Sequence, residues 1–547
     1  MTNLVKSIRR GEPMIWFTGS ALGVSILMIA GLIVVILTNG LSFFWPKSLE
    51  QLTLEDGSVF LGEVTNREPI PNPGQPDHLQ KHRILLRVGN RDLLGFDFKW
   101  VNEDEIARRE APRDAYFIER REYGALIGTP VAVNKGDRTL AADTAAAEGA
   151  LAGLIHKAER DRHAIETIEK HEIGAINYRI EKARLEGRRL DLIARNEPAR
   201  DLSKERAAVE KTTAEQQALF QTRTAELAAL MEKAGTTFVS FRTADGATKD
   251  LRSLDIFRAY PANELGWFGR LGVYSGRLWE FVTDNPRESN TEGGIFPAIF
   301  GTVMMVILMS IVVVPLGVLA ALYLREYAKQ GALVRTVRIA VNNLAGVPSI
   351  VFGVFGLGFF VYFVGGGIDR LFFPEALPTP TFGTGGILWA SLTLALLTVP
   401  VVIVASEEAL AAVPRSMREA SLAMGATKFQ TILRVVLPAA APGILTGLIL
   451  AMARGAGEVA PLMLTGVVKL APELPIDGFF PFAHLDRKFM HLGFHIYDVG
   501  FQSPNVEAAK PMVYTTTIFL LIIVVLLNLT AIIVRNKLRE RYKTGAF

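Results

Sequence analysis

The hydrophobic positions of this chain gather into six long runs, and the segments between them are rich in charge. A hydrocarbon core of about 30 Å requires roughly 20 apolar residues in an α-helix. Six segments meet this requirement: Ile15–Leu37, Phe296–Leu324, Pro348–Val364, Ile387–Val404, Pro442–Val468 and Met512–Val534. The pattern therefore predicts a membrane protein with six spans.

The first span is followed by Phe43, Phe44 and Trp45. Aromatic residues are enriched where a membrane meets water, whereas a signal peptide ends in small residues at its cleavage site. We therefore expect an uncleaved span with an interfacial aromatic anchor.

A long polar insertion, residues 46–290, separates the first two spans. Alternating apolar and polar positions predict β-rich parts at 51–140 and 236–262. Residues 143–234 instead carry apolar residues at every third or fourth position, which is typical of helices in a coiled-coil hairpin. The break at Asn196-Glu197-Pro198 is its expected turn. The hairpin is interpreted either as a rigid spacer or as a dock for a partner or another subunit.

The chain thus divides into three parts. Residues 1–45 hold the N-terminus and the first span, 46–290 form the insertion, and 291–547 hold five spans with a loop at 406–440. The expected fold is an all-α transmembrane bundle of six helices carrying a large α+β insertion with a long helical hairpin.

Positive charges near the span ends predict the orientation. They gather at Lys6, Arg9 and Arg10, at Arg325, Lys329, Arg335 and Arg338, at Arg415, Arg418, Lys428 and Arg434, and at Arg535, Lys537, Arg539, Arg541 and Lys543. Six spans bring all four groups to one side, and basic residues favour the cytoplasmic side. Both termini are then expected in the cytoplasm, and the insertion outside it.

Composition excludes several classes of protein. The 547 residues include no cysteine, so there is no disulfide framework, thiol nucleophile or cysteine-ligated metal. The net charge of +4 gives no nucleic-acid footprint. No G-x-x-x-x-G-K-[ST] phosphate loop is present, so the chain cannot hydrolyse ATP alone by that route.

One motif lies between the fourth and fifth spans, where Arg418–Lys428 is followed by Thr431–Pro438. Gly425 permits a sharp turn with positive φ, and small residues let a helix approach a partner closely. Leu437-Pro438 is expected to end the element before the next span. The pattern favours a helix–turn–helix that inserts into a partner over an ordinary amphipathic loop.

The fifth span contains two charged residues, Arg454 and Glu458, which are four positions apart and expected to share a helix face. A charge near the bilayer centre costs at least about 2.5–3.5 kcal/mol, so such residues usually line a pathway. An arginine fork suits a tetrahedral oxyanion. The alternative is a structural ion pair.

Other polar residues are weaker candidates. Asn343 and Ser349 lie at the start of the third span, where helix capping explains them equally well. His491 and His495 have the spacing of a metal pair on a helix, but we interpret them as part of a surface or gating helix and expect no metal site.

The motif between spans four and five resembles the cytoplasmic "EAA" loop of ABC-importer permeases. That loop reads Glu-Ala-Ala, three residues, Gly, nine residues and Ile-x-Leu-Pro. The residues that match it in register are Glu419, Ala420, Gly425, Leu437 and Pro438, with Ser421 and Val435 as mild departures.

Three stretches, at Pro286–Thr302, Asn343–Gly353 and Ala453–Leu462, further resemble phosphate permeases of the PstA type. The resemblance implies a non-enzymatic subunit in a bacterial inner membrane, in contact with lipid, that carries inorganic phosphate through a pathway including Arg454, Glu458, Asn343 and Ser349. It implies a PstC-type second permease, a PstB-type ATPase that uses ATP and Mg, and a PstS-type phosphate-binding protein. No cofactor is expected on this chain, and no nucleic acid.

Two alternatives stay open. One is a permease for another oxyanion or small solute. The other is a membrane-anchored scaffold or sensor that acts through its extracytoplasmic hairpin.

Overall fold

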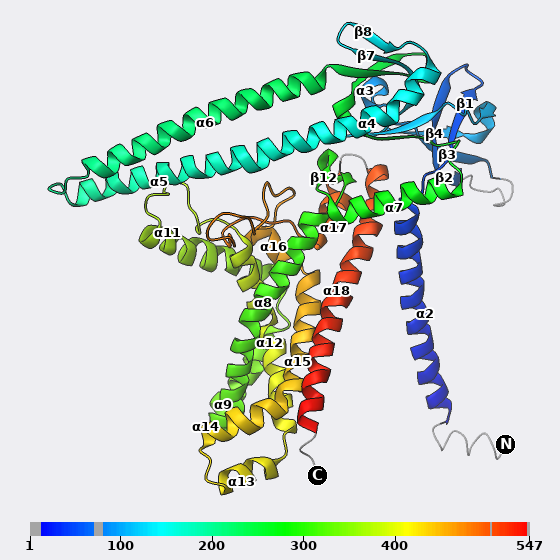
Figure 1. The fold of residues 1–547 in the computed structure, drawn as a ribbon. Helices are drawn as coiled ribbons and strands as arrows, with labels where there is room; N and C mark the ends of the chain where they lie inside the picture. Colours follow the sequence, from blue (N-terminus) through cyan, green and yellow to red (C-terminus); the bar gives the residue numbers. More distant parts are fainter. Residues whose placement is uncertain (1–11, 71–79, 504–505, 544–547) are drawn as a thin grey trace, which may run out of the picture.

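The computed structural model describes residues 12–70, 80–503 and 506–543. It consists of a head with two β-sheets and a long helical arm, which lies across one end of a helical bundle (Figure 1). We call the opposite end of the bundle the base. The basic residues Lys6, Arg9 and Arg10 lie outside the described residues.

The first sheet of the head is antiparallel and has the strand order β4-β3-β2-β1-β5. Its strands are β1 (Leu49–Leu54), β2 (Val59–Pro69), β3 (His82–Arg87), β4 (Phe98–Asn102) and β5 (Ile106–Glu110), and the short helix α3 (Arg91–Leu94) follows β3. Leu52, Ile84, Leu86 and Val101 are buried together and form a core on one face of this sheet.

The second sheet has the order β10-β9-β7-β6-β11, with β8 paired to β7. Its strands are β6 (Tyr116–Arg120), β7 (Leu126–Lys135), β8 (Arg138–Ala141), β9 (Thr237–Arg242), β10 (Thr248–Arg252) and β11 (Ile256–Pro261). The arm leaves this sheet after β8 and returns at β9.

The arm has one long outgoing limb and one returning limb. The outgoing limb comprises α4 (Thr144–Glu166), a π-helical turn (Thr167–Ile173) and α5 (Gly174–Asn196), and the returning limb is α6 (Ser203–Gly235). Arg206 of α6 pairs with Asp191 of α5 at 2.8 Å, and Arg223 pairs with Glu172 at 3.0 Å. The limbs therefore run antiparallel.

The arm is fixed to the head at its root. Asp143 caps α4 by accepting from the backbone N–H of Ala146 at 2.8 Å. The buried Arg162 donates to the carbonyls of Leu254 and Ile256. Because these bonds satisfy part of a buried cation, α4 cannot swing away from the sheet without losing them.

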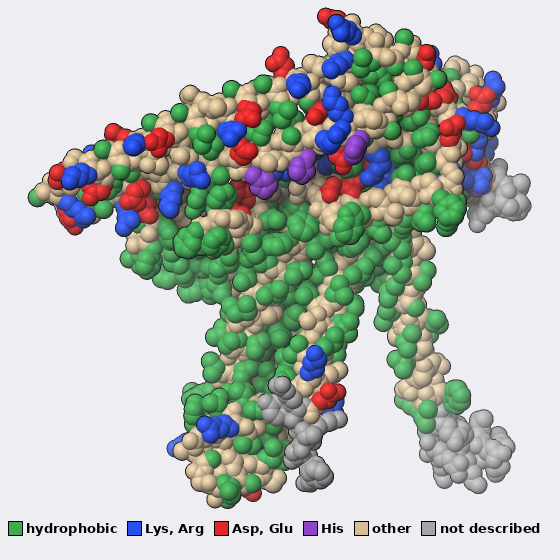
Figure 2. Space-filling view, viewed as in Figure 1, with side chains coloured by type: hydrophobic (Ala, Val, Ile, Leu, Met, Phe, Trp, Pro, Cys, Tyr) green, Lys and Arg blue, Asp and Glu red, His purple; other side chains and the backbone are tan. Residues whose placement is uncertain are grey.

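The bundle contains helices long and apolar enough to cross a membrane, and six such helices lie in the described part of the chain. The helices outside the head and arm are α2 (Glu12–Ser42), α7 (Trp267–Thr283), α8 (Phe296–Leu322), α9 (Ala332–Leu344), α10 (Ser349–Phe355), α11 (Gly366–Phe372), α12 (Ile387–Ala412), α13 (Arg415–Ala423), α14 (Lys428–Thr431), α15 (Leu437–Gly457), α16 (Ala460–Thr465), α17 (Leu492–Phe501) and α18 (Val506–Lys543). Figure 2 shows charged side chains on the head and arm and at the base, with a mostly hydrophobic bundle between them. The prediction of six spans is confirmed.

Helix α12 is the centre of the bundle. Its apolar side chains are mostly buried against α8 on one side and α15 on the other. Gly317 of α8 lies against Val402, while Gly443 and Gly447 of α15 lie against Ala409 and Ala405. A methyl group at any of these glycines would clash, so small residues permit the close approach.

The first span, α2, lies apart from the bundle except near its head end (Figure 1). There the hydroxyl of Thr515 on α18 donates to the carbonyl of Gly40 at 2.9 Å. The expected aromatic anchor is partly internal, because Phe44 is buried against Tyr274 and Phe281. Only part of Phe43–Trp45 is therefore free to face lipid.

The fifth span differs from its prediction at both ends. It was predicted as Pro442–Val468, but the continuous helix runs from Lys428 to Gly457. Glu458 has extended backbone angles, and the separate helix α16 follows. The third span is longer than predicted, Ser349–Phe372, because α10, a π-helical segment (Gly356–Gly365) and α11 continue one another.

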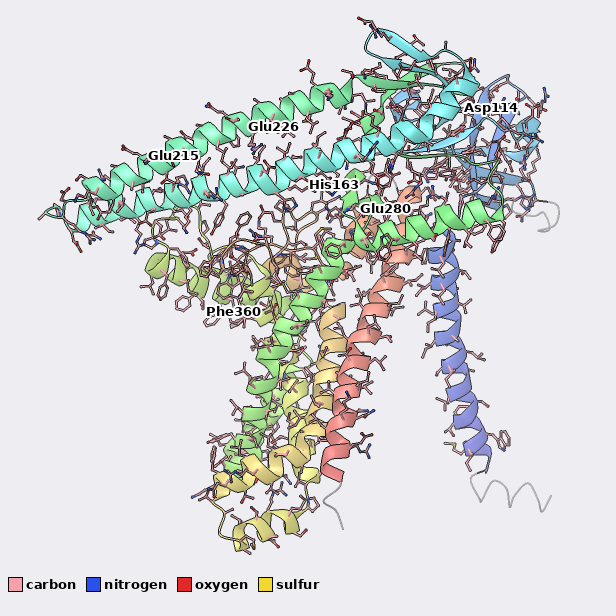
Figure 3. All side chains as sticks on the ribbon, viewed as in Figure 1. Asp114, His163, Glu215, Glu226, Glu280 and Phe360 are labelled. Atoms are coloured by element: carbon pink, nitrogen blue, oxygen red, sulfur yellow. The ribbon has the colours of Figure 1, made fainter. Side chains whose placement is uncertain are left out.

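A buried network of charges joins the head to the bundle through α7. Glu119 of β6 accepts from Arg277 of α7 at 2.7 Å and from Arg258 of β11 at 3.0 Å. Arg258 also donates to Glu280 of α7 at 3.0 Å (Figure 3 labels Glu280), and Glu280 pairs in turn with Arg287, just before α8. Burial alone would raise the pKa of Glu119, but Arg277 and Arg258 outweigh it and lower that pKa.

The segment between α7 and α8 is held by both neighbours. It contains the small antiparallel pair β12 (Pro286–Arg287) and β13 (Glu292–Gly293). Glu288 pairs with Arg91 of the head. Asn290 is buried and donates to Asp498 of α17 at 3.2 Å. The segment therefore links the head, α17 and the start of α8.

Removing the carboxylate at the centre of this network should destabilise the head. In Glu119→Ala, the largely buried Arg258 and Arg277 lose their shared partner, and removing one partner of a buried ion pair costs up to about 3–5 kcal/mol. The midpoint of urea-dependent proteolysis of the head should fall accordingly. Glu103→Ala removes an exposed partner of Arg67 and is the matched control, expected to change the midpoint little. An equal midpoint for both variants would contradict the role of Glu119.

Candidate functional site

The first candidate site is an exposed helix–turn–helix at the base, formed by α13 and α14 (Figure 1). Gly425 lies in the turn between them with φ of +86°, a backbone conformation that glycine adopts without strain. Thr427 then caps α14 in a capping box with Gln430. Glu419, Ala420 and Gly425 are all exposed.

The motif is held against the bundle by an ion pair and by contacts of Lys428 that sequence reasoning missed. Arg418 donates to Glu326 at 3.1 Å and to the carbonyls of Leu410 and Val413. Lys428 bonds the backbone of Glu326 and lies over the ring of Tyr327. The sequence offered one signal for this ion pair: Glu326 lies close to the end of the second span, in a segment otherwise rich in basic residues.

The surface that the motif presents is apolar. Met424 is 88% exposed and Phe429 63% exposed, and Met417 and Leu422 are exposed beside them. Side chains of this kind are usually buried, and their clustering around one turn is typical of a surface that another protein covers.

Leu437 and Pro438 do not end this element, contrary to expectation. They lie half-buried inside the helix that runs from Lys428 to Gly457. A π-helical turn, Ile432–Val436, directly precedes them. Proline lacks an N–H and crowds the preceding turn, and the widened π turn is where the helix accommodates it.

The second candidate site is the pair Arg454 and Glu458, where α15 ends. Arg454 Nε lies 3.6 Å from Glu458 Oε1, and both side chains are partly exposed. The two residues were expected to share one helix face. They are close instead because the chain turns out of the helix at Glu458, whose ψ is 135°.

The break has a packing cause. Gly455 lies against Met309 of α8, so that a Cβ there would fall 2.7 Å from the sulfur. Pro461, in the first turn of α16, cannot donate the hydrogen bond that a continuous helix requires. Gly353 of α10 then packs against Pro461. The break therefore brings α8, α10 and α15 together around one short irregular segment.

The remaining predicted pathway residues are placed differently. Asn343 is exposed near the end of α9, and Ser349 is half-buried at the start of α10. Among the described residues, neither makes a hydrogen bond to Arg454 or Glu458. The structure thus brings together two of the four predicted residues by direct contact.

Helix α17 closes the bundle behind the break. His491 precedes α17, and its Nδ1 accepts from the backbone N–H groups of Gly493 and Phe494. Gly493 in turn lies against Val459. His495 is also buried, and Asp498 pairs with Lys469 at 3.3 Å. In the described part of the chain, no cluster of three or more metal-binding side chains occurs.

Burial without a charged partner lowers the pKa of His491 to about 4. For His495, burial likewise lowers the pKa to about 4, although the nearby Asp498 opposes the shift. Both rings therefore prefer the neutral state in the folded protein.

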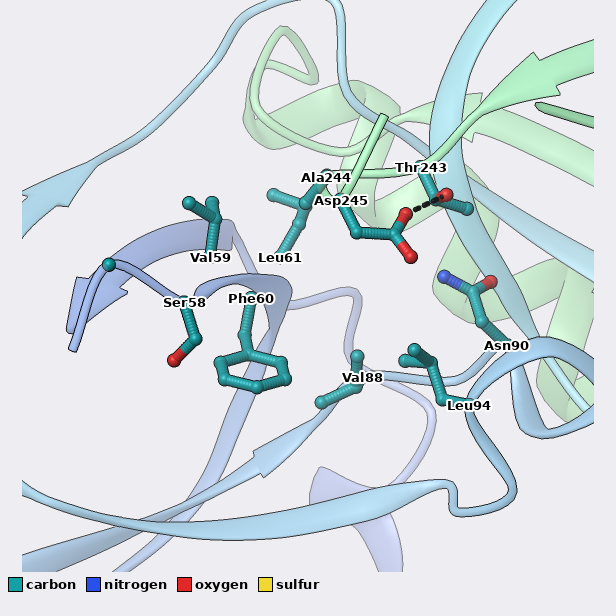
Figure 4. A pocket seen from close by; sticks show the side chains of 11 residues that line it. Ser58, Val59, Phe60, Leu61, Val88, Asn90, Leu94, Thr243, Ala244 and Asp245 are labelled. Carbon is teal, nitrogen blue, oxygen red and sulfur yellow. Dashed lines mark hydrogen bonds between the residues drawn. The ribbon is translucent and has the colours of Figure 1, made fainter. Parts of the chain in front are cut away.

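A separate cavity of about 370 Å³ lies in the head (Figure 4). It is lined by Phe60, Val88 and Leu94 and by Asp245, whose carboxylate accepts from the hydroxyl of Thr243. It lies among the strands and turns of the two sheets and takes no part in either candidate site.

Comparisons with known proteins all point to membrane subunits of transport systems. Residues 313–544 match the model of binding-protein-dependent transport system inner membrane components. A probable ABC transporter permease, YqgI of Bacillus subtilis, is 30% identical over 237 residues, which cover 42% of this chain and 74% of that protein. The phosphate transport system permease protein PstA of Mycobacterium leprae is 38% identical over 196 residues, covering 35% of this chain and 59% of that protein.

Coverage limits what these relatives imply. YqgH, a probable ABC transporter permease of Bacillus subtilis, is 34% identical, and the match covers 36% of this chain and 62% of that protein. This chain therefore spans about three fifths of the length of several relatives. A chain of the MetNI methionine ABC transporter matches 48% of this chain and 98% of its own length at 20% identity, with a TM-score of 0.31, which is too weak to bear on the fold.

The two buried histidines predict a pH-dependent stability. An unfolded histidine has a pKa of about 6.5, so the unfolded chain binds more protons than the folded one between about pH 6.5 and pH 4. Stability should be fully present above this window and fall as the pH drops through it. The melting temperature measured from pH 7.5 to 4.5 should therefore decrease.

In His495→Gln the decrease should be smaller, because one of the two groups no longer takes up a proton on unfolding. His163, which is exposed on the arm (Figure 3), provides the control, since His163→Gln should leave the profile unchanged. Superimposable profiles for wild type and His495→Gln would show that His495 contributes nothing.

Proposed function

Because the chain belongs to the family of ABC transporter permeases, we propose that it is one permease subunit of an ATP-driven importer of inorganic phosphate. Proteins of this family are multi-pass membrane proteins and transport subunits rather than enzymes, and a separate subunit hydrolyses ATP. The chain makes no covalent change to its solute.

The observation that carries the importer assignment is the exposed apolar turn at the base. Met424 and Phe429 flank Gly425, and Arg418 fixes α13 to the end of the second span through Glu326. A rigidly mounted apolar protrusion fits a groove on a partner and transmits its movement. We propose that an ATPase subunit holds Glu419, Ala420 and Gly425 in this groove, and that Leu437 and Pro438 carry the motion into the fifth span.

Two observations support phosphate as the solute, the first of which also distinguishes it from other tetrahedral oxyanions. Relatives from Mycobacterium and Yersinia bear the name phosphate transport system permease protein PstA. In addition, Arg454 offers donors that suit a tetrahedral anion. Its contact with Glu458 is longer than a hydrogen bond, so its donors are not all engaged.

Glu458 complements this role. It holds Arg454 in place when no anion is bound, and it disfavours a fully ionised anion while it accepts a hydrogen bond from a protonated phosphate. The exposed Asn343 and the half-buried Ser349 are proposed to line the same pathway closer to the start of the third span. An importer of another oxyanion or small solute is the alternative.

The proposed assembly follows from the family. A PstC-type permease completes the pathway, PstB-type ATPase subunits bind the base, and a PstS-type phosphate-binding protein delivers solute at the head end. ATP and Mg act only in the ATPase. Both termini then lie in the cytoplasm, and residues 46–290 lie outside a bacterial inner membrane. The pathway opens alternately to each side as the base is pulled together and released.

The solute and its site are tested together by uptake of radiolabelled phosphate in cells that lack the native chain. Wild type should restore uptake, and excess sulfate or molybdate should not compete. Arg454→Ala should reduce uptake by about tenfold or more, because a charged hydrogen bond contributes about 1.5–3 kcal/mol. Arg370→Ala, an exposed arginine outside the pathway, should behave as wild type. No phosphate uptake with wild type would reject the solute.

A double variant separates solute binding from a structural ion pair. If Arg454 only holds Glu458, then Arg454→Ala, Glu458→Ala and the double variant should lose the same amount of uptake. If Arg454 binds solute, Arg454→Ala should lose much more than Glu458→Ala.

Coupling is tested at Gly425. A Cβ at this position meets nothing in the chain, so Gly425→Asp adds only the local strain of its positive φ, about 1–2 kcal/mol, while it places a charged side chain in the contact with the ATPase. Uptake should be abolished, although the protein still reaches the membrane. Gly246 of the head has φ of +85° and equally open surroundings, so Gly246→Asp is the matched control for backbone strain.

The scaffold alternative predicts the reverse pattern. Deletion of the arm should then abolish function while Gly425→Asp does little. The importer assignment is rejected if this reverse pattern is found.

A further inference from the structure

Helix α7 has a location and a surface that the transport function leaves unexplained. It connects the last strand of the head to the segment before α8, and it runs across the direction of α8 and α18 rather than along it (Figure 1). It lies level with the head end of α2. A helix of 17 residues is thus placed where the bundle meets the head.

All three charged side chains of α7 lie on one side of the helix and bond other parts of the protein. Arg277 bonds Glu119 and the hydroxyl of Tyr260, and Glu280 is buried between Arg258 and Arg287. Arg270 donates to the carbonyl of Leu265 and the hydroxyl of Ser48. This is the inverse of an ordinary surface helix, in which charges face water and apolar residues face the protein.

The opposite face of α7 is exposed and uncharged. Phe268 is 83% exposed and Trp279 is 71% exposed, and Trp267 and Leu271 are exposed on the same side. Ser275 lies between them in helical spacing, and small residues occupy the remaining exposed positions. Three exposed aromatic rings on a face without charges are typical of a surface that contacts lipid or another protein.

The bilayer is the cover that the surroundings favour. The chain continues from α7 through a short linker into α8, whose exposed residues, such as Ile307 and Ile311, belong to a membrane span. On the other side, Phe44 and Trp45, at the end of the first span, pack against Tyr274 of α7. Helix α7 therefore lies between the head-side ends of two membrane spans, at the level where its exposed face would meet lipid.

We propose that α7 lies in the plane of the membrane interface on the head side, with Trp267, Phe268, Leu271 and Trp279 inserted among the lipid headgroups and the adjoining acyl chains. Tryptophan prefers this depth because its ring is apolar and its indole N–H finds polar partners there. The charged face of α7 then binds the head through the Glu119 network. Because the other face contacts lipid, α7 fixes the distance between the head and the bilayer. The proposal does not depend on the identity of the solute.

The test uses single nitroxide labels on the full chain, purified with its co-expressed partner subunits in lipid nanodiscs. The chain contains no cysteine, so one introduced cysteine gives one label. Ser275→Cys places the label on the aromatic face with a nearly isosteric change. Thr222→Cys, exposed on α6 of the arm, is the control for water, and Thr530→Cys, exposed on α18, is the control for the bilayer.

Oxygen concentrates in lipid and a nickel chelate stays in water, so the ratio of their collision rates with the label reports depth. At Ser275→Cys the ratio should be several-fold higher than at Thr222→Cys and approach that at Thr530→Cys. A ratio equal to that at Thr222→Cys would place the face in water and overturn the proposal. A label shielded from both reagents would show that another subunit covers α7, which overturns it as well. Equal melting temperatures for the labelled and unlabelled proteins show that the fold is retained.

Discussion

The arrangement of this protein depends on how charges are paired where the head meets the bundle. The charges come from two strands, from α7 and from the segment before α8, and they are mutually paired and largely shielded from solvent: Glu119, Arg258, Arg277, Glu280 and Arg287. A buried charge without its partner is costly, so these elements are constrained to keep one relative position. The head is therefore fixed to the first residues of the second span.

A short series of contacts connects this charge network to the candidate pathway residues. Asn290, three residues beyond Arg287, bonds Asp498 of α17, and α17 packs through Gly493 against Val459, next to Glu458. The irregular segment at the end of α15 is thus enclosed by α8, α10 and α17 rather than left to move freely. Contiguous packed elements therefore connect the head to the candidate pathway residues.

The two ends of the bundle differ in what they leave uncovered. At the base, Met424 and Phe429 surround a turn that the ion pair of Arg418 and Glu326 holds in place, which suits a groove on a moving partner. At the head end, α7 exposes an aromatic face without charges, which suits lipid. An apolar surface is thus recognised by its setting as well as its composition, because the first surrounds a turn that connects two spans and the second lies where the bundle meets the head.

The sequence alone determined the six spans, since a run of about 20 apolar residues has few stable environments other than a bilayer. It also determined the turn at Gly425, because spacing and positive φ are local properties. The sequence did not determine where the fifth helix begins and ends. Leu437-Pro438 continues the helix because a π turn accommodates the proline, and the break at Glu458 follows from the packing of Gly455 on Met309 and of Pro461 on Gly353. Nor did it reveal the orientation of α7, whose Arg277 is paired with Glu119 of β6, a residue distant in sequence. These features were decided by tertiary structure, since each depends on contacts between segments that only the fold brings together.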